Sequence, residues 1–543
     1  MGQVGGVYLI VGGRRLRTTD PDVTCCKGSD VCKEQPGGSA LSLGNDSRGM
    51  TRKVTSSVTW TGALHSVILA VNLAFTAVLA RLLAPADFGV MAGAMIFLSF
   101  AQMVLQSGIV PTLVHKRKLT VDDLRGAFTL VVMLATVIFV LLVLLAPLAA
   151  AFLRLEAIEI VLQVLAFALL IEAFGIVPET LLIRRLEVRR VMLIEICARV
   201  IGSGLVGISL AVLGWGYWAL VAARMADTTF KGVALLLLVR PPLAPMVRLE
   251  ALQRLAPKSA GFTLRALLNF VALNGDTAIV GRYFDVASLG LYTRAYHLMS
   301  LPAEFYGKAA RRVVFPAMAR VQDEPARLKA AFLRGLSLTA LLGLPLCAVL
   351  VVLARDVVKL LLGGQWLGVV PIFMVLAASM YLRLGANVSG SLLNASGSVS
   401  ALVIIQAIYA VTIIAGCVLA YPYGLFALAG AVATAIFLHF LVISAAGCRR
   451  AGATVMDFVS AHTHGGLLAV LTGTLTWAAA APCWAANFEG LVPIMSSGLI
   501  LSLLALVLMV RRPRILLGSN GAEFLAGMQS LVAERLLYMA RRA

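Results

Sequence analysis

The chain has 543 residues, of which 60% are hydrophobic and only 13% are charged, and its excess of Lys and Arg gives a formal net charge of +20. Soluble domains carry about 25% charged residues, and disordered chains have the opposite composition, so both classes are excluded. The apolar runs are continuous rather than alternating, which excludes a β-barrel and predicts an all-α polytopic membrane protein.

Residues 1–49 differ from the rest of the chain. They are rich in Gly, Ser and Asp, and Cys25, Cys26 and Cys32 lie close together in them. The apolar stretch Val7–Gly12 is too short for the hydrophobic core of a signal peptide. We expect this segment to be a mis-assigned extension before a natural start at Met50, or else a disordered cytoplasmic tail.

From Met50 onward, about fourteen apolar runs follow one another, each of roughly the twenty residues that a bilayer requires. The predicted spans are 56–80, 88–111, 126–150, 158–182, 191–213, 215–239, 259–282, 287–310, 333–354, 368–392, 400–420, 422–446, 464–485 and 490–510. We interpret 50–240 as an N-terminal six-helix lobe, 241–258 as a cytoplasmic linker and 259–447 as a C-terminal six-helix lobe. Residues 448–511 then hold two extra helices, and 512–543 form an amphipathic cytoplasmic tail.

The positive charge follows the predicted loops. Alternate loops are rich in Lys and Arg, as Lys116–Arg125, Arg184–Arg190 and Arg311–Lys329 show. Basic loops stay on the cytoplasmic side of a membrane and face its anionic lipids, so both termini are predicted to be cytoplasmic. The net charge therefore needs no nucleic-acid partner.

An internal repeat supports the two lobes. Four residues recur after 201 positions at the loops that follow spans 1 and 7: Arg81, Ala86, Gly89 and Ala94 correspond to Arg282, Ala287, Gly290 and Ala295. Two repeats with an even number of spans have the same orientation. They predict lobes related by a pseudo-two-fold axis along the membrane normal, with a central cavity between them.

Polar side chains fall on single faces of several predicted spans, where contact with lipid would be costly. At 100° per residue each set shares a helix face: Arg265, Asn269 and Asp276; Arg294, His297, Glu304 and Lys308; Arg383 and Asn387. The first two sets, on spans 7 and 8, hold more cations than partners, which predicts a cavity for an anionic substrate. Phosphate is the group that several Arg and Lys side chains hold best.

Other polar groups have a structural interpretation. Glu195 and Arg199 stand at i,i+4 and are expected to neutralise each other, and Arg224, Asp227 and Lys231 form a similar string. The GxGxxG match Gly202–Gly207 lies within a span and predicts close helix packing rather than dinucleotide binding. No P-loop or metal-ligand spacing occurs in the sequence, so no cofactor and no metal site are predicted.

Four segments carry recognisable patterns: Arg81–Gly89 with its continuation to His115, Leu289–Pro302, Val314–Arg320 and the LGxxW element in Leu361–Trp366. Together they resemble the bacterial polysaccharide transporter family. The sequence is similar to Wzx-like lipid-linked oligosaccharide flippases, in the branch with colanic-acid and succinoglycan-type exporters. These belong to the multidrug/oligosaccharidyl-lipid/polysaccharide exporter superfamily.

The resemblance implies a flippase, not an enzyme, in the bacterial inner membrane. Such a protein moves undecaprenyl-pyrophosphate-linked repeat units by alternating access for exopolysaccharide or lipopolysaccharide synthesis. A polysaccharide polymerase and a chain-length regulator are the implied partners. Arg265, Arg294 and Lys308 would bind the pyrophosphate, Arg383, Asn269 and Asn387 the phosphate or sugar, and Asp276 or Glu304 would couple an ion.

Two alternatives remain. A multidrug or cation antiporter of the same superfamily should show surplus carboxylates in its cavity. A membrane-bound polymerase or glycosyltransferase should have a large outer loop or an aqueous domain. The sequence has neither feature, which favours the flippase.

Overall fold

The computed structural model describes residues 8–11, 14–17, 47–115, 121–185, 187–239 and 260–511. The chain divides into two units, Met1–Val54 and Thr55–Ala543. The first unit contains a short antiparallel hairpin of β1 (Tyr8–Val11) and β2 (Arg14–Arg17), in which Tyr8 is opposite Arg17. The second unit is built from helices.

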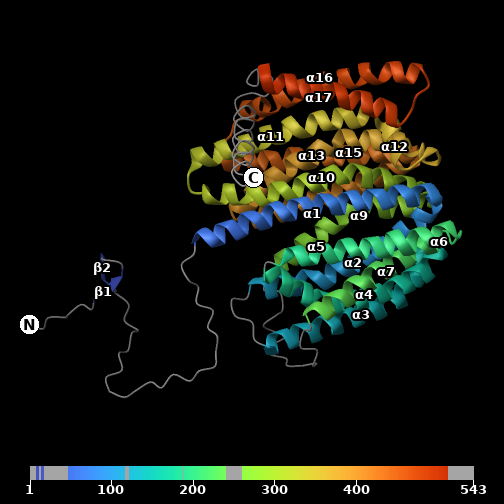
Figure 1. The fold of residues 1–543 in the computed structure, drawn as a ribbon, viewed down its shortest axis with the longest axis horizontal. Coiled ribbons are helices and arrows are strands. Elements are labelled where there is room, and N and C mark those ends of the chain that lie inside the picture. Colours follow the sequence, from blue (N-terminus) through green and yellow to red (C-terminus); the bar gives the residue numbers. More distant parts are fainter. Residues whose placement is uncertain are drawn as a thin grey trace, which may run out of the picture. The chain divides into compact units, whose positions relative to one another are not determined.

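Helices overlap each predicted span, and several of them, such as α10 and α16, extend well beyond its bounds (Figure 1). An N-terminal group comprises α1 (Ser47–Leu82), α2 (Pro85–His115), α3 (Val121–Leu153), α4 (Ala157–Arg184), α5 (Val188–Arg199), η1 (Val200–Gly207), α6 (Ile208–Val212) and α7 (Tyr217–Val239). A C-terminal group comprises α9 (Ala260–Tyr283), α10 (Val286–Arg320), α11 (Pro325–Val352), α12 (Ala354–Leu361), η2 (Gly364–Trp366), α13 (Val369–Ala395), α14 (Val399–Ala420), η3 (Tyr421–Tyr423) and α15 (Leu425–Ala451). Two further helices follow, α16 (Val455–Ala485) and α17 (Leu491–Arg511).

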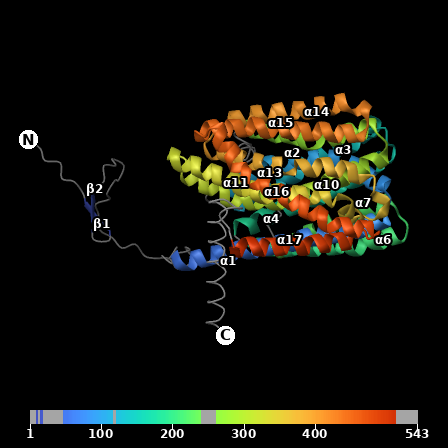
Figure 2. The same ribbon diagram turned by 90° about the horizontal axis from the view of Figure 1, so that it is seen from above.

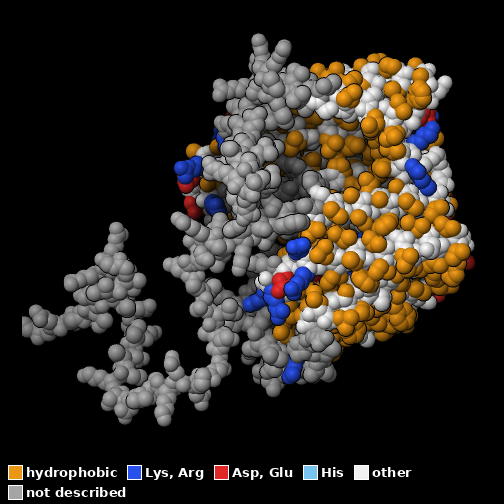
Figure 3. Space-filling model, viewed as in Figure 1, with side chains coloured by type: hydrophobic (Ala, Val, Ile, Leu, Met, Phe, Trp, Pro, Cys, Tyr) orange, Lys and Arg blue, Asp and Glu red, His pale blue; other side chains and the backbone are white. Residues whose placement is uncertain are grey.

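Ten helices in the described part are long and apolar enough to cross a membrane. Helices suit this environment because every backbone N–H and C=O is satisfied within the segment. Apolar side chains also cover the outside: Leu144, Leu213 and Leu419 are each about two-thirds or more exposed, and hydrophobic side chains dominate the described surface in Figure 3. The chain is therefore a multi-pass membrane protein, while the count of fourteen spans and the two-lobe symmetry stay predictions.

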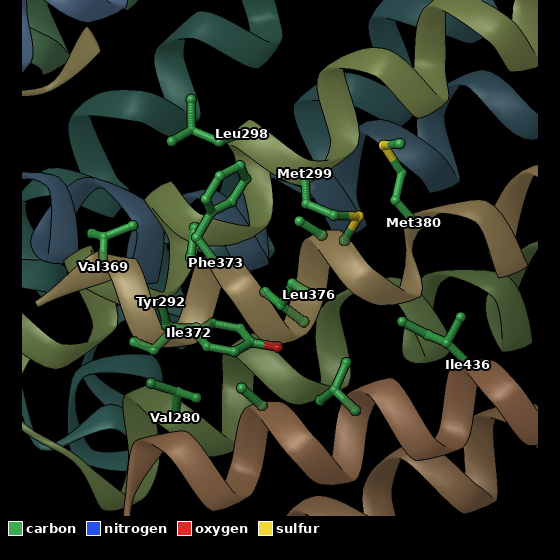
Figure 4. Close-up of a cluster of buried hydrophobic side chains, with 14 of the residues drawn as sticks. Val280, Tyr292, Leu298, Met299, Val369, Ile372, Phe373, Leu376, Met380 and Ile436 are labelled. Carbon is green, nitrogen blue, oxygen red and sulfur yellow. The ribbon is translucent and has the colours of Figure 1, made fainter. Parts of the chain in front are cut away.

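Long helices pack side by side in both views (Figures 1 and 2). Helices α2, α3, α4 and α7 pack on one another in the N-terminal group, and α10, α11, α13 and α15 do so in the C-terminal group. Helix α2 joins the groups by packing against α10 and α9, while α16 packs on α11 and α17 on α16. In Figure 4, Val280, Tyr292, Phe373, Leu376 and their neighbours fill the core of the C-terminal group.

The GxGxxG segment forms η1, a π-helical turn between α5 and α6. At Gly202 an added Cβ would lie 2.6 Å from the Ala223 carbonyl oxygen and 2.7 Å from Asp227 Cβ. Only glycine permits this approach of the backbone to α7, so the segment is a packing motif.

Candidate functional site

A cavity of about 290 Å³ lies where α2 of the N-terminal group meets α9 and α10 of the C-terminal group. Its apolar lining includes Met91, Met95 and Leu273. Its polar lining comprises Ser99, Asn274, Thr277, Thr293, Arg294, Tyr296, His297 and Ser300. None of the described lining residues is acidic, so Arg294 makes this cavity positive.

Arg294 is held by an aromatic ring rather than by a carboxylate. Its guanidinium lies 4.6 Å from the centre of the Phe88 ring on α2, a cation–π contact that orients the planar group. The Nε atom of Arg294 is buried and has no hydrogen-bond partner in the described part of the chain. A guanidinium with unused donors can bind an anionic oxygen.

Helix α10 carries most of the polar lining, and Asp285 fixes where it begins. The Asp285 carboxylate accepts hydrogen bonds from the backbone N–H groups of Ala287 and Ser288, at 3.1 and 3.3 Å, and from Ser288 Oγ at 2.6 Å. The Ser288 hydrogen bonds lower the pKa of this carboxyl below its usual value. This N-cap satisfies the first N–H groups of the helix, and it sets the register that places Thr293, Arg294 and His297 in the cavity.

Behind the cavity, a buried network links α9, α10 and α13. Asp276 is fully buried, and it accepts a hydrogen bond from the Tyr292 hydroxyl at 2.6 Å and one from Thr277 N at 2.7 Å. Arg383 Nη1 donates to the Tyr296 hydroxyl at 2.6 Å, and the guanidinium lies 4.8 Å from the centre of the same ring. Asp276 is not among the described residues that line the cavity, since Tyr292 and Thr277 hydrogen-bond its buried carboxylate.

The structure brings together only some of the predicted site residues. Arg294 and His297 line the cavity, and Asp276 and Arg383 lie in the adjoining network. Asn269 is exposed and lies 3.5 Å from Gln406 Nε2, while the Asn387 carbonyl accepts a hydrogen bond from Ser391. The side chains of Arg265, Lys308 and Glu304 lie outside the described residues.

Sequence reasoning missed the uncharged half of this site. Tyr292 and Tyr296 hold Asp276 and Arg383, and Asn274 and Ser300 line the cavity. Tyr296 directly precedes His297, and neighbours in sequence do not share a helix face. Tyrosines are also common at membrane interfaces, so neither periodicity nor residue type pointed to Tyr296. Their role depends on which neighbouring helix they face.

The N-terminal group has its own charged cluster, around a cavity of about 70 Å³. Arg199 contacts Asp227 at 3.4 Å, Arg224 contacts Asp227 at 3.5 Å and Glu172 at 3.8 Å, and Lys231 contacts Glu179 at 3.0 Å. The expectation that Glu195 neutralises Arg199 is wrong, since the partner of Arg199 lies on α7. Arg224 and Asp227 lie one turn apart on α7, and the other three contacts pair α7 with α4 or α5. Such pairing is how polar groups in membrane helices are usually accommodated.

The described residues contain no group of three or more His, Cys, Asp or Glu side chains that could hold a metal ion. The repeat-related residues Arg81, Gly89, Arg282 and Gly290 do not line the cavity. Arg81 and Arg282 lie at the ends of α1 and α9, and Gly89 and Gly290 lie near the starts of α2 and α10.

Solved structures with this fold are membrane transporters. The lipid II flippase MurJ, in an inward closed conformation, aligns with a TM-score of 0.65 and 11% sequence identity, over 84% of this chain and all of that chain. An inward-facing multidrug resistance MATE family transporter of the MOP superfamily aligns with a TM-score of 0.57 and 14% identity, over 70% of this chain and 94% of the other. The fold is thus that of a MurJ- and MATE-like membrane transporter.

Residues 78–371, more than half of the chain, match the polysaccharide biosynthesis protein family, and the chain belongs to that family. The resemblance predicted from the sequence is confirmed. Relatives include the teichuronic acid biosynthesis protein TuaB of Bacillus subtilis, 26% identical over 64% of this chain and 72% of that protein. The lipopolysaccharide biosynthesis protein WzxC of Escherichia coli is 24% identical over 64% of this chain and 71% of that protein. The succinoglycan biosynthesis transport protein ExoT of Rhizobium meliloti is 24% identical over 60% of this chain and 66% of that protein.

Proposed function

We propose that this protein is a flippase that moves an undecaprenyl-pyrophosphate-linked oligosaccharide across the bacterial inner membrane for exopolysaccharide or lipopolysaccharide synthesis. The positive cavity between α2, α9 and α10 carries this proposal, because its described lining includes Arg294 and no carboxylate. The names of the relatives, which concern polysaccharide synthesis and transport, agree with such a substrate.

The substrate has two parts, and the cavity offers a surface for each. Arg294 supplies a planar cation that suits a pyrophosphate oxygen pair. Asn274, Thr293 and Ser300 offer the small hydrogen-bonding groups that sugar hydroxyls require. Arg265 and Lys308, on the same two helices, would add positive charge, and Arg383, Asn269 and Asn387 would contact the sugar or phosphate at other stages of transport.

Transport would proceed by alternating access between the two helix groups, with both termini in the cytoplasm. Asp276 or Glu304 would couple the movement to an ion gradient, since an intramembrane carboxylate changes charge when it binds a proton or cation. A polysaccharide polymerase would receive the product on the far side, with a chain-length regulator as its companion.

Gene disruption complemented by Arg294→Gln tests the proposal. A charge-assisted hydrogen bond contributes roughly 1.5–3 kcal/mol, so we expect export of polymer to fall about tenfold or more while lipid-linked repeat units accumulate on the inner leaflet. Arg294→Lys keeps the charge and should restore part of the export. The matched control is Arg327→Gln, which removes an exposed arginine paired with Glu324 at 3.0 Å.

Normal export by Arg294→Gln would contradict the assignment of the cavity. Unchanged polymer after gene disruption, together with new sensitivity to cationic drugs, would instead favour a multidrug or cation antiporter. That alternative has the same fold, but the described lining of the cavity lacks the carboxylates that would attract a cationic drug.

A further inference from the structure

The two arginines of the sequence repeat make reciprocal contacts across the helix groups. Arg81, at the end of α1, donates through Nη2 to the Leu360 carbonyl of α12 at 2.6 Å. Arg282, at the end of α9, donates through Nη1 to the Phe152 and Ala151 carbonyls of α3, at 2.8 and 3.2 Å. Each arginine therefore reaches from the first helix of its own group into the other group.

The acceptors are equivalent as well. Ala151 and Phe152 lie in the last turn of α3, the third long helix of the N-terminal group. Leu360 lies in the last turn of α12, which continues α11, the third long helix of the C-terminal group. The last carbonyls of a helix lack partners within the helix and carry its partial negative charge, so an arginine is well suited to bind them.

The two glycines of the repeat mark the closest approach between the groups. A Cβ added to Gly89 would lie 1.9 Å from the Val286 carbonyl oxygen, and one added to Gly290 would lie 1.9 Å from the Pro85 carbonyl oxygen. Both positions are buried. The first turns of α2 and α10 thus touch backbone to backbone, which any larger residue would prevent.

Two side chains of η2 bind backbone carbonyls at the end of α1. Trp366 is fully buried and donates through Nε1 to the Ala80 carbonyl at 2.7 Å, and Gln365 donates to the Ala80 and Leu83 carbonyls at 2.6 and 3.1 Å. The Trp366 ring also packs edge-on against Phe88, with centroids 5.3 Å apart. Phe88 is the ring that holds Arg294, so this end of the bundle is in contact with the wall of the cavity.

We propose that Arg81 and Arg282 form a reciprocal clasp that holds this end of the transporter closed, and that the Gly89–Gly290 contact is the pivot about which the two groups part. The proposal rests on the alternating-access function proposed above. Opening this end would break the arginine hydrogen bonds and hydrate the freed carbonyls. Because hydrogen bonds near water have small net energies, the clasp can release without a large cost.

Distance measurement between spin labels tests the clasp directly in the full chain in nanodiscs. The labels are introduced as noncanonical amino acids at Glu156, after α3, and at Tyr423, in η3. Both positions are exposed, and they belong to different helix groups. We expect Arg81→Gln and Arg282→Gln each to raise the ratio of long to short distances about five-fold, as the loss of a hydrogen bond predicts. The double variant should raise this ratio further. Arg282→Lys, which keeps the positive charge, should show a smaller rise than Arg282→Gln.

Arg154→Gln is the matched control, because Arg154 is an exposed arginine next to the end of α3 and makes none of the clasp contacts. An unchanged distance distribution in the double variant, or the same shift in Arg154→Gln, would overturn the clasp. The readout needs no substrate, so a failed clasp and a failed flippase assignment are separate results. Loss of export with normal distances would implicate the arginines in another step.

Discussion

At the scale of residues, the site combines arginines with aromatic rings instead of carboxylates. Arg294 packs on Phe88 and Arg383 on Tyr296, at 4.6 and 4.8 Å. An ion pair would neutralise each guanidinium, whereas an aromatic ring orients it and leaves its charge available. The cavity can keep its positive charge in this way until an anion enters it.

Tyr296→Phe tests this role for the ring and its hydroxyl. The variant keeps the cation–π contact but removes the 2.6 Å hydrogen bond to Arg383, which leaves a half-buried charge with one partner fewer. We expect a loss of stability of about 1.5–3 kcal/mol, as for a hydrogen bond to a charged group, measured as a lower Tm of the purified protein. Tyr283→Phe is the control, since Tyr283 stacks on Tyr421 at the surface; equal Tm values for the two variants would contradict the prediction.

At the scale of elements, α12 connects three parts of the chain. Its Leu360 carbonyl accepts the hydrogen bond from Arg81, and the buried Asp356 accepts hydrogen bonds from Trp484 Nε1 and Gly490 N, at 3.0 and 2.7 Å. Glu489 pairs with Arg355 at 2.8 Å and with Lys359. The connection between α16 and α17 is therefore attached to α12, the helix whose Leu360 carbonyl binds Arg81.

The attachment of Glu489 to α12 should depend on pH. The hydrogen bond from Lys359, with Arg355 nearby, lowers the pKa of Glu489 below its ordinary value of 4.5. A lowered pKa in the folded state means that the contribution to stability is complete above about pH 4.5 and is lost as the pH falls through the folded value. We expect hydrogen exchange of residues 486–490, corrected for its intrinsic pH dependence, to rise in acid, and Glu489→Gln to exchange fast throughout. Identical pH profiles for both proteins would show that Glu489 is not the responsible group.

At the scale of the whole molecule, we expect the close contact between α2 and α10 to control whether this end of the protein can close. Gly290→Ala places a methyl group against the Pro85 carbonyl, while alanine itself favours the helix. We therefore expect folded protein that cannot close this end, with long label distances and export reduced at least tenfold. Gly430→Ala, in a helix position with open space around it, should leave both unchanged. Short distances in Gly290→Ala would show that the helices can rearrange around the methyl group.

The sequence by itself determined the class of protein and its family. Apolar runs of bilayer length require helices, because lipid offers no hydrogen bonds to the backbone, and the segments quoted above carry the family resemblance. Helical periodicity also singled out Arg294, His297, Asp276 and Arg383 as polar residues on shared helix faces. Such periodicity places a residue on a face of its own helix, and it contains no information about which helix lies opposite.

Only the tertiary structure decided the partners. Arg199 contacts Asp227 on α7 rather than Glu195 one turn away, Asp276 is covered by Tyr292, and Arg294 lies on Phe88 of the other helix group. The repeat of Arg81 and Arg282 was visible in the sequence, yet its reciprocal contacts depend on carbonyls of α12 and α3, which are far away along the chain. Helix packing brings such distant residues together, because the shape and charge of whole helix faces, and not local sequence, select their neighbours.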